Sequence, residues 1–435
     1  MTDKNRLPLI VSQVFEMLNT KHIKYAVLRN YEGLPYTNKS RDIDILIKEK
    51  EYPIIKSELA KCFLKYGYKI VTFFESERLR TFICGKVESE NIELVQFDFF
   101  THTSAYGHII LTDEDILASR ILTKGIYHVS KEFEFLDKYL YLKYIGAEYP
   151  SKYATLREQM IESSQMKELL KHLFGINSLK ELEDMSVKEF RKRNRKMGRE
   201  RIDNILLFWK YYIKNIVCCK GYSIGFTGPD GSGKTTVINS LHSCLSLVYS
   251  KINLYHFRPM MFGNLGEVIH STGLKKEVDR KYDKPHRGKK VGCLNSLIRL
   301  FYYSMDYIIG YLRCIRPSLM KRELVIFDRY YTDIICDSRR SRIYLNTKFI
   351  YWFGKLFIPS LNYNILLTAN TDTILDRKRE LDKEGIEAIN KKIDYLANKK
   401  GYYKVLNEGT PQEAVAEILR IVFEEQHKKN LKRSR

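Results

Sequence analysis

In the C-terminal half of the chain, short apolar runs alternate with stretches of helical periodicity. The apolar runs occupy residues 222–228, 252–257, 323–328, 363–368 and 402–407. Short apolar runs that are each followed by a helical stretch are typical of parallel strands joined by helices. We therefore predict a parallel α/β domain over residues 219–426. The remaining basic tail, 427–435, is predicted to be frayed, as the last residues of a chain commonly are.

The N-terminal part has a different pattern. A helical pattern covers residues 7–20 and a second one covers 51–67. Strand-like runs lie at 23–29, 42–48, 68–74, 78–84 and 92–100. Several strands with few intervening helices indicate an α+β domain, which we place at residues 1–150.

Residues 151–218 are rich in Lys, Arg, Glu and Leu at helical spacing, so we predict a helical connector whose charge run is a solvated face. At its end, residues 205–219 mix aromatic side chains with lysines. Such a helix either packs on a neighbouring domain or lies on a membrane surface. We favour packing, because basic amphipathic helices are common in soluble proteins.

Charge and cysteine usage narrow the class of protein. The net charge is +22, which favours anionic partners, but no nucleic-acid motif accompanies it, so nucleic acid is not a favoured partner. The eight cysteines form no CxxC pair and no zinc-like spacing. With no signal peptide and no apolar run of membrane-spanning length, we expect a cytoplasmic protein.

The strongest chemical signal is GPDGSGKTT at residues 228–236, which matches G-x-x-x-x-G-K-[ST] between a strand and a helix. In this phosphate-binding loop (P-loop), backbone N–H groups and the helix N-terminus hold phosphate. Lys234 is expected on the β- and γ-phosphates, and Thr235 on Mg²⁺. The cofactors are then ATP and Mg²⁺. The predicted nucleotide-binding residues are Gly228, Pro229, Asp230, Gly231, Ser232, Gly233, Lys234, Thr235 and Thr236.

Two further features narrow the fold family. Asp230 lies inside the loop, and Asp328-Arg329-Tyr330 ends the third strand. Together with the loop, this combination resembles the thymidylate kinase family over residues 220–425. The resemblance implies that Asp328 positions Mg²⁺ and that Arg329 and Arg258 bind the acceptor phosphate. It also implies that Asp230 contacts the acceptor's sugar hydroxyl, and it makes a dimer plausible.

The resemblance also places a mobile lid at Arg377 and Arg379, where the alternative is a solvated helix face. Independently of any family, a migrating phosphoryl group spreads negative charge over its oxygens, so cations must converge on it. Arginine suits this task because its planar fork binds phosphate through two hydrogen bonds. With Lys234, Asp328 and Arg329, these two arginines complete the predicted catalytic set.

The chain departs from that family after Tyr330. The residues that would hold the nucleotide are replaced by Asp333, Asp337 and Ser338, and Arg340 and Arg342 add positive charge. The acceptor is then dTMP or another phosphorylated or hydroxyl-bearing small molecule. The predicted substrate-binding residues are Asp230, Arg258, Arg329, Asp333, Asp337 and Arg340. The basic segment 259–290 is either a flexible insertion or a substrate-binding loop.

In the N-terminal domain, Asp42 and Asp44 form D-x-D on a strand, and strand alternation puts both carboxylates on one face. Asp98 on a later strand is a candidate third metal ligand, and Arg29 a candidate phosphate contact. Carboxylates around metal ions suit nucleotidyl transfer. The segment SRDIDILI resembles the second motif of the nucleotidyltransferase superfamily over residues 1–150. LRNYEG stands where that superfamily has a Gly-Ser turn.

The sequence therefore predicts an ATP- and Mg²⁺-dependent phosphotransferase of the nucleoside monophosphate kinase type. It would be an α/β P-loop kinase domain fused to an α+β nucleotidyltransferase-like domain. One alternative is a P-loop switch ATPase that regulates the N-terminal domain. The other is a protein whose basic surface binds nucleic acid or a membrane and whose N-terminal carboxylates are inert. The expected partner is a small-molecule phosphate acceptor, and a membrane surface is not favoured.

Overall fold

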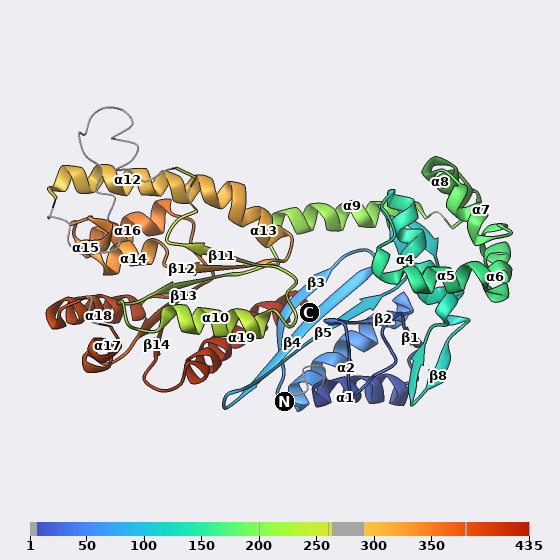
Figure 1. The fold of residues 1–435 in the computed structure, drawn as a ribbon, viewed down its shortest axis with the longest axis horizontal. Helices are drawn as coiled ribbons and strands as arrows, with labels where there is room; N and C mark the ends of the chain where they lie inside the picture. The colour runs from blue at the N-terminus through green and yellow to red at the C-terminus, as the bar shows by residue number, and fades with distance from the viewer. Residues whose placement is uncertain (1–6, 200, 260, 263–290, 379–380, 435) are drawn as a thin grey trace. The chain divides into compact units, whose positions relative to one another are not determined.

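The computed structural model describes residues 7–199, 201–259, 261–262, 291–378 and 381–434 (Figure 1). The chain forms two compact units. The first contains Met1–Lys86, Glu93–Val217 and Gln426–Arg435, and the second contains Val87–Ile92 and Cys218–Glu425. The two units are described in turn.

The second unit is built on an all-parallel sheet, which in the described residues has five strands in the order β11-β12-β10-β13-β14. The strands are β10 (Ser223–Thr227), β11 (Ile252–His256), β12 (Leu324–Asp328), β13 (Tyr363–Thr368) and β14 (Tyr402–Leu406). The five predicted strands and their parallel pairing are confirmed. The mixed α/β architecture is consistent with a P-loop kinase fold, and β10, which leads into the P-loop, lies in the centre.

Helices cover both faces of this sheet, with α12 and α16 over one face and α10 over the other in Figure 1. The central strands β10 and β13 are buried along their whole length, as expected of a doubly covered parallel sheet. Before the last helix, the described helices of this unit are α10 (Lys234–Leu245), α12 (Cys293–Gly310), α13 (Arg316–Met320), α14 (Tyr331–Cys336), α15 (Ser338–Ser341), α16 (Thr347–Phe357), α17 (Thr371–Arg377) and α18 (Lys383–Ala397), with a π-helical turn at Tyr311–Ile315.

The last helix, α19 (Pro411–Ser434), begins at the predicted cap, where the Thr410 hydroxyl accepts a hydrogen bond from the Glu413 backbone N–H at 3.2 Å. The prediction of a frayed tail at 427–435 is wrong, since α19 continues through it to Ser434. Buried Asn430 donates to the carbonyls of Ile70 and Val71 at 3.1 and 2.9 Å. These carbonyls belong to β3, a strand at the edge of its sheet, whose backbone groups on one side lack a neighbouring strand. The hydrogen bonds from Asn430 fix the tail in place because they supply donors to these carbonyls.

The first unit contains a mixed sheet, which among the described residues has seven strands in the order β3-β4-β5-β2-β1-β9-β8. Its central strands β2 and β5 are parallel. The strands are β1 (Tyr25–Val27), β2 (Asp42–Ile47), β3 (Lys69–Glu75), β4 (Leu79–Glu88), β5 (Asn91–Phe100), β8 (Ile121–Thr123) and β9 (Ile126–His128). The helices and strands predicted up to residue 100 are confirmed.

Other elements of this unit follow β5 and lie in a stretch that sequence periodicity leaves unassigned. They are the hairpin strands β6 (Thr103–Ala105) and β7 (His108–Leu111) and the helices α3 (Asp113–Leu117) and α4 (Lys131–Ile145). The predicted helices near the N-terminus are α1 (Leu9–Thr20) and α2 (Tyr52–Lys65). Both bury apolar side chains in a core with the sheet.

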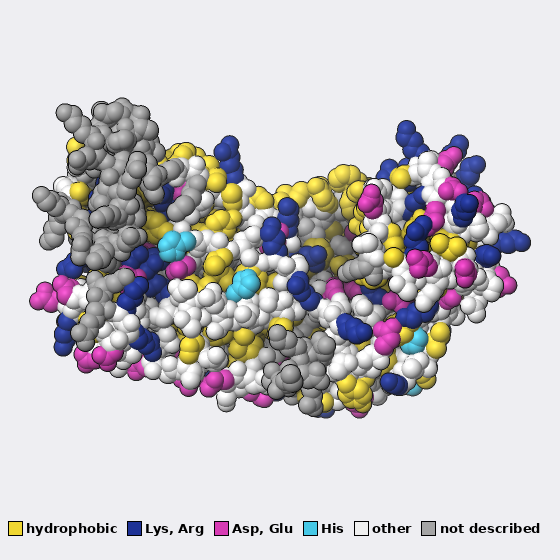
Figure 2. Space-filling model, in the orientation of Figure 1, with side chains coloured by type: hydrophobic (Ala, Val, Ile, Leu, Met, Phe, Trp, Pro, Cys, Tyr) yellow, Lys and Arg dark blue, Asp and Glu magenta, His cyan; other side chains and the backbone are white. Residues whose placement is uncertain are grey.

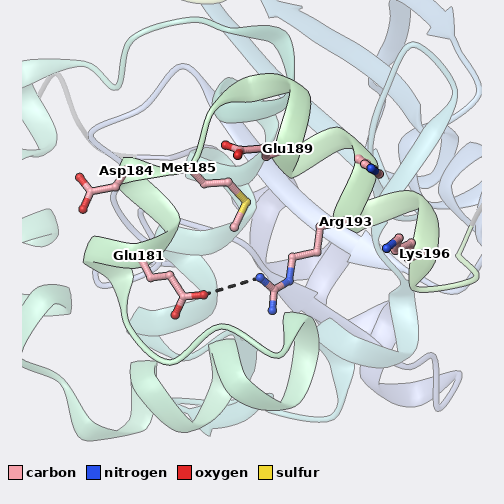
Figure 3. Close-up of a pocket in the computed structure, with 7 residues that line it drawn as sticks. Glu181, Asp184, Met185, Glu189, Arg193 and Lys196 are labelled. Atoms are coloured by element: carbon pink, nitrogen blue, oxygen red, sulfur yellow. Dashed lines mark ion pairs between the residues drawn. The ribbon is translucent and has the colours of Figure 1, made fainter.

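Most of the described residues in 151–217 are helical, and they belong to the first unit. The helices are α5 (Ala154–Glu162), α6 (Ser164–Phe174), α7 (Leu179–Asp184), α8 (Val187–Lys196) and α9 (Ile202–Val217). The first four share a core with α4, in which Phe174 and Phe190 are fully buried. A hollow of about 640 Å³ lies between α7 and α8 (Figure 3), and Glu181 and Arg193 form an ion pair of 3.6 Å there.

Among the described residues, the contacts of helix α9 lie along one of its faces. Phe208 lies edge-on to Tyr106 beside the turn at Gly107, and the Asn204 amide donates to the Gly107 carbonyl at 2.7 Å. On another face Trp209 and other apolar side chains are more than half exposed, and Figure 2 shows hydrophobic side chains gathered over this helix. Among the described helices, none combines the length and apolarity needed to cross a bilayer.

Candidate functional site

The P-loop follows β10 and ends in the first turn of α10. Gly231 and Gly233 have φ of +88° and +86°, a backbone conformation that glycine adopts without steric cost. A Cβ atom on Gly228 would lie 1.9 Å from the Leu367 carbonyl oxygen. The glycines are therefore required by this backbone path, which leads the chain into the N-terminus of a helix where phosphate binding is favourable.

Lys234 is buried in this loop, where its Nζ donates to the carbonyls of Gly228 and Pro229 at 2.7 and 2.8 Å. Burial, helped by the nearby charge of Arg329, lowers the pKa of Lys234 to about 8. The Asn407 amide, just after β14, donates to the Ser232 carbonyl at 2.8 Å and holds the loop from outside. The lysine is thus preorganised inside the loop, and an anionic ligand would offset its desolvation.

Asp328 ends β12, the strand next to β10, and His256 of β11 approaches it with Nδ1 3.2 Å from Oδ2. Burial acts to raise the pKa of Asp328, but the His256 hydrogen bond and the charges of Arg329 and Lys234 hold it below its usual value. Asp328 Oδ1 is buried and has no hydrogen-bond partner among the described residues. A charged carboxylate oxygen of this kind fits Mg²⁺, and Thr235 offers an exposed hydroxyl at the start of α10.

Arg329 and Arg340 converge on Asp230, and each donates to one of its carboxylate oxygens. Arg329 has φ of +71°, a strained backbone conformation that is common at functional sites. Its Nε lies 3.5 Å from buried Asp333, whose pKa burial raises to about 6. Asp337 accepts from the Arg340 backbone N–H at 3.0 Å. The structure therefore brings together five of the six predicted substrate-binding residues in one cluster of alternating charges.

The sixth, Arg258, is buried after β11, where its guanidinium lies 3.2 Å from Asp306 Oδ2 and over the Tyr303 ring. Asp306 is also buried and accepts from the Phe262 backbone N–H at 3.0 Å. Sequence reasoning missed Asp306, although a carboxylate within the apolar run FYYSMDYII is itself a signal. A buried charge of this kind requires a partner.

The Asp306→Ala variant is expected to destabilise the second unit by about 3 kcal/mol, because it leaves the Arg258 charge buried without its carboxylate. The measurement is urea unfolding followed by Trp352 fluorescence in a Trp209→Phe background, since the chain has only two tryptophans. The Arg258→Leu/Asp306→Leu double variant should recover much of the loss. A single variant as stable as the parent would contradict a structural ion pair.

The predicted lid is described only in part. Arg377 is the last residue of α17, and its exposed side chain donates to the Asn407 carbonyl at 2.8 Å. This contact places it next to the P-loop, since Asn407 also holds that loop. Arg379 lies outside the described residues, as does most of the basic segment 259–290.

A second cluster lies in the first unit, where Asp42 and Asp44 of β2 meet Asp98 of β5. The parallel register pairs Asp44 with Asp98, and one ligand oxygen from each of the three residues lies within 4.8 Å of the others. The side chain of Arg29 donates to Asp44 at 2.5 Å, so it neutralises a carboxylate. Burial, together with the neighbouring carboxylates, raises the pKa of Asp44 to about 7 despite this arginine. Three carboxylates this close fit a divalent cation, which would offset their repulsion.

Comparisons with known proteins add little to this geometry. No protein-family model matches the chain, and no curated protein matches it. Among solved structures, the chain is similar to the thymidylate kinase from Ehrlichia chaffeensis, with 17% identity over 46% of this chain and 98% of that chain and a TM-score of 0.32. At this level of likeness, reaction and substrate have to be inferred from the side chains of the site.

The sequence did not indicate several residues that complete these clusters. They are His256 beside Asp328, Asn407 against the P-loop, Asp306 behind Arg258, and Asp137, which lies 3.9 Å from Arg29. Position at a strand end was the available signal for His256 and Asn407, since polar side chains at the carboxyl edge of a parallel sheet gather at one site.

Proposed function

We propose that the second unit is an ATP- and Mg²⁺-dependent phosphotransferase of the nucleoside monophosphate kinase type. The observation that carries the proposal is the buried Lys234 inside a glycine loop. The charges of Arg329 and Asp328 lie close enough to act on the pKa of Lys234, and the charge of Lys234 in turn helps to lower the pKa of Asp328. Backbone N–H groups, a lysine and a helix N-terminus suit a triphosphate tail. Thr235 and Asp328 would hold Mg²⁺, which when bound neutralises phosphate charge.

The acceptor would bind beside the loop, at the cluster formed by Asp230, Arg329 and Arg340. Its guanidinium groups suit an acceptor phosphate, and the carboxylates of Asp230 and Asp333 can accept from hydroxyls. In the ligand-free protein these opposite charges satisfy one another. An acceptor with both phosphate and hydroxyl groups would replace both halves of these ion pairs, so we propose dTMP or a related phosphorylated small molecule.

The Arg329→Ala variant is expected to lower kcat/KM for the acceptor about 100-fold, while KM for ATP changes much less. The measurement is ADP formation with each substrate varied in turn, over a panel of phosphorylated acceptors. The Arg339→Ala variant, whose side chain pairs with Asp382 on the surface, is the control and should behave as the parent. Equal effects on ATP and acceptor would count against an acceptor role for Arg329.

The alternative for this unit is a switch ATPase that regulates the N-terminal domain. It is separated from a kinase by one comparison, the rate of ADP formation with and without acceptor. A kinase should be nearly silent without acceptor, whereas a switch ATPase should hydrolyse ATP at the same rate in both conditions.

For the first unit we propose metal-dependent nucleotidyl transfer, which the close approach of Asp42, Asp44 and Asp98 favours. These carboxylates would hold divalent ions, whose chemistry in such reactions is to activate a hydroxyl and bind a triphosphate. Arg29 would orient Asp44 through its hydrogen bond and favour the charged form of this carboxylate, against the effect of burial.

A further inference from the structure

Arg29 lies between two carboxylates that come from different elements of the first unit. Its Nε donates to Asp44 Oδ2 of β2 at 2.5 Å, whereas its Nη2 lies 3.9 Å from Asp137 Oδ2 of α4. The first contact is a hydrogen bond, and the second is an ion pair that is too long for one. A movement of the guanidinium by about 1 Å would complete the second contact. Arg29 is therefore bound to one carboxylate and has another within reach.

The carboxylate that holds this guanidinium is also needed by the proposed metal site. Asp44 belongs to a cluster with Asp42 and Asp98, in which one oxygen from each residue lies within 4.8 Å of the others. An arginine carries one charge, whereas a divalent ion carries two and can contact several carboxylates at once. Asp44 has two oxygens, but an arginine and a metal ion bound to them would repel each other at such short range. Arg29 and a divalent ion therefore compete for Asp44.

Asp137 is oriented so that it can receive the displaced arginine. Its Oδ1 accepts a hydrogen bond from the Thr103 hydroxyl at 2.5 Å, and its Oδ2 is the oxygen nearest to Arg29. The side chain of Asp137 is 12% exposed, and among the described residues Arg29 is the one cation that forms an ion pair with it. A largely buried carboxylate gains from a charge-assisted hydrogen bond. Asp137 thus offers a second binding place for the same guanidinium.

Of the two partners in the Arg29–Asp44 pair, the arginine has more freedom to move. Asp44 lies on a central strand of the sheet and its side chain is 6% exposed, whereas the side chain of Arg29 is 22% exposed. Burial acts to lower the pKa of Arg29, but the charges of Asp44 and Asp137 raise it above its usual value. The guanidinium therefore stays charged beside either carboxylate.

We propose that Asp137 is a positioning residue, which receives the Arg29 guanidinium from Asp44 when a divalent ion binds the carboxylate cluster. The inference rests on the metal-dependent nucleotidyl transfer proposed for this unit, and it adds how the cluster makes room for its metal. Arg29 is the counter-charge of Asp44 until the ion takes its place. Asp137 lowers the cost of this exchange, because the arginine keeps a carboxylate partner after it has left Asp44.

The experiment measures the Mn²⁺ affinity of the full chain without nucleotide, from the electron paramagnetic resonance signal of free Mn²⁺. The binding that disappears in the Asp42→Ala variant belongs to the cluster. Asp137→Asn keeps the shape of the side chain and should weaken this binding about tenfold, as is common for groups behind metal ligands. The control is Asp184→Asn, which changes an exposed carboxylate of the same unit and should bind Mn²⁺ as the parent does.

A double-variant cycle separates the proposed role from a general effect of charge. Arg29→Met retains an apolar stem and removes the competing cation, so it should bind Mn²⁺ more tightly than the parent. When Asp137→Asn is added to Arg29→Met, the affinity should change less than about twofold, because no guanidinium remains to be received.

Two results would overturn the proposal while leaving the metal site in place. They are a tenfold loss from Asp137→Asn in both backgrounds, and weaker Mn²⁺ binding by Arg29→Met than by the parent. A third result, no Mn²⁺ binding that depends on Asp42, would refute the metal site of the proposed function and the exchange with it.

Discussion

Replacement of Lys234 by alanine is expected to lower kcat/KM for phosphoryl transfer by about 10³-fold, the largest single effect we predict in the second unit. The reason is geometric: Nζ already lies inside the loop, bound to the Gly228 and Pro229 carbonyls, so removing it leaves the triphosphate without its buried cation. The measurement is ADP formation in the presence of the best acceptor from the panel, at saturating magnesium.

A matched control is Lys355→Ala, which removes an exposed lysine of α16 in the same unit and should leave the rate unchanged. Far-UV circular dichroism of both variants checks that the fold is retained. Phosphoryl transfer at the parental rate in the Lys234→Ala protein would contradict the proposed site. Absence of any nucleoside triphosphate binding by the parent protein would do the same.

Replacement of Asp42 by alanine is expected to abolish nucleotidyl transfer by the first unit, with a loss of about 10³-fold or more. Asp42 is half-buried and lies next to the Asp44–Asp98 pair, so its loss removes one of three ligand oxygens without emptying the core. The measurement is transfer of label from α-phosphate-labelled nucleoside triphosphates, in magnesium and in manganese.

The control for this variant is Asp184→Ala, an exposed carboxylate of the same unit outside the cluster. It should transfer label as the parent does. A parent protein that transfers no label from any of the common nucleoside triphosphates would indicate a catalytically silent domain. In that case Arg29 and the three carboxylates would form a structural ion cluster.

The features that sequence alone determined are local ones. The P-loop could be recognised because Gly231 and Gly233 are required by a left-handed backbone that few other residues adopt, and because an apolar run and a helical pattern flank them. The D-x-D motif also follows from local geometry, since alternation along a strand puts Asp42 and Asp44 on one face whatever their surroundings. Each of these signals lies within about ten residues of sequence.

Tertiary structure decided which distant residues lie next to these motifs. Asp98 lies next to Asp44 because β2 and β5 pair in a parallel register. Asp306 lies next to Arg258 because α12 packs beside the sheet. The tail was misjudged because the carbonyls that hold Asn430 belong to β3, about 360 residues earlier. Sequence patterns record which groups need a partner, whereas strand register and helix packing select the partner.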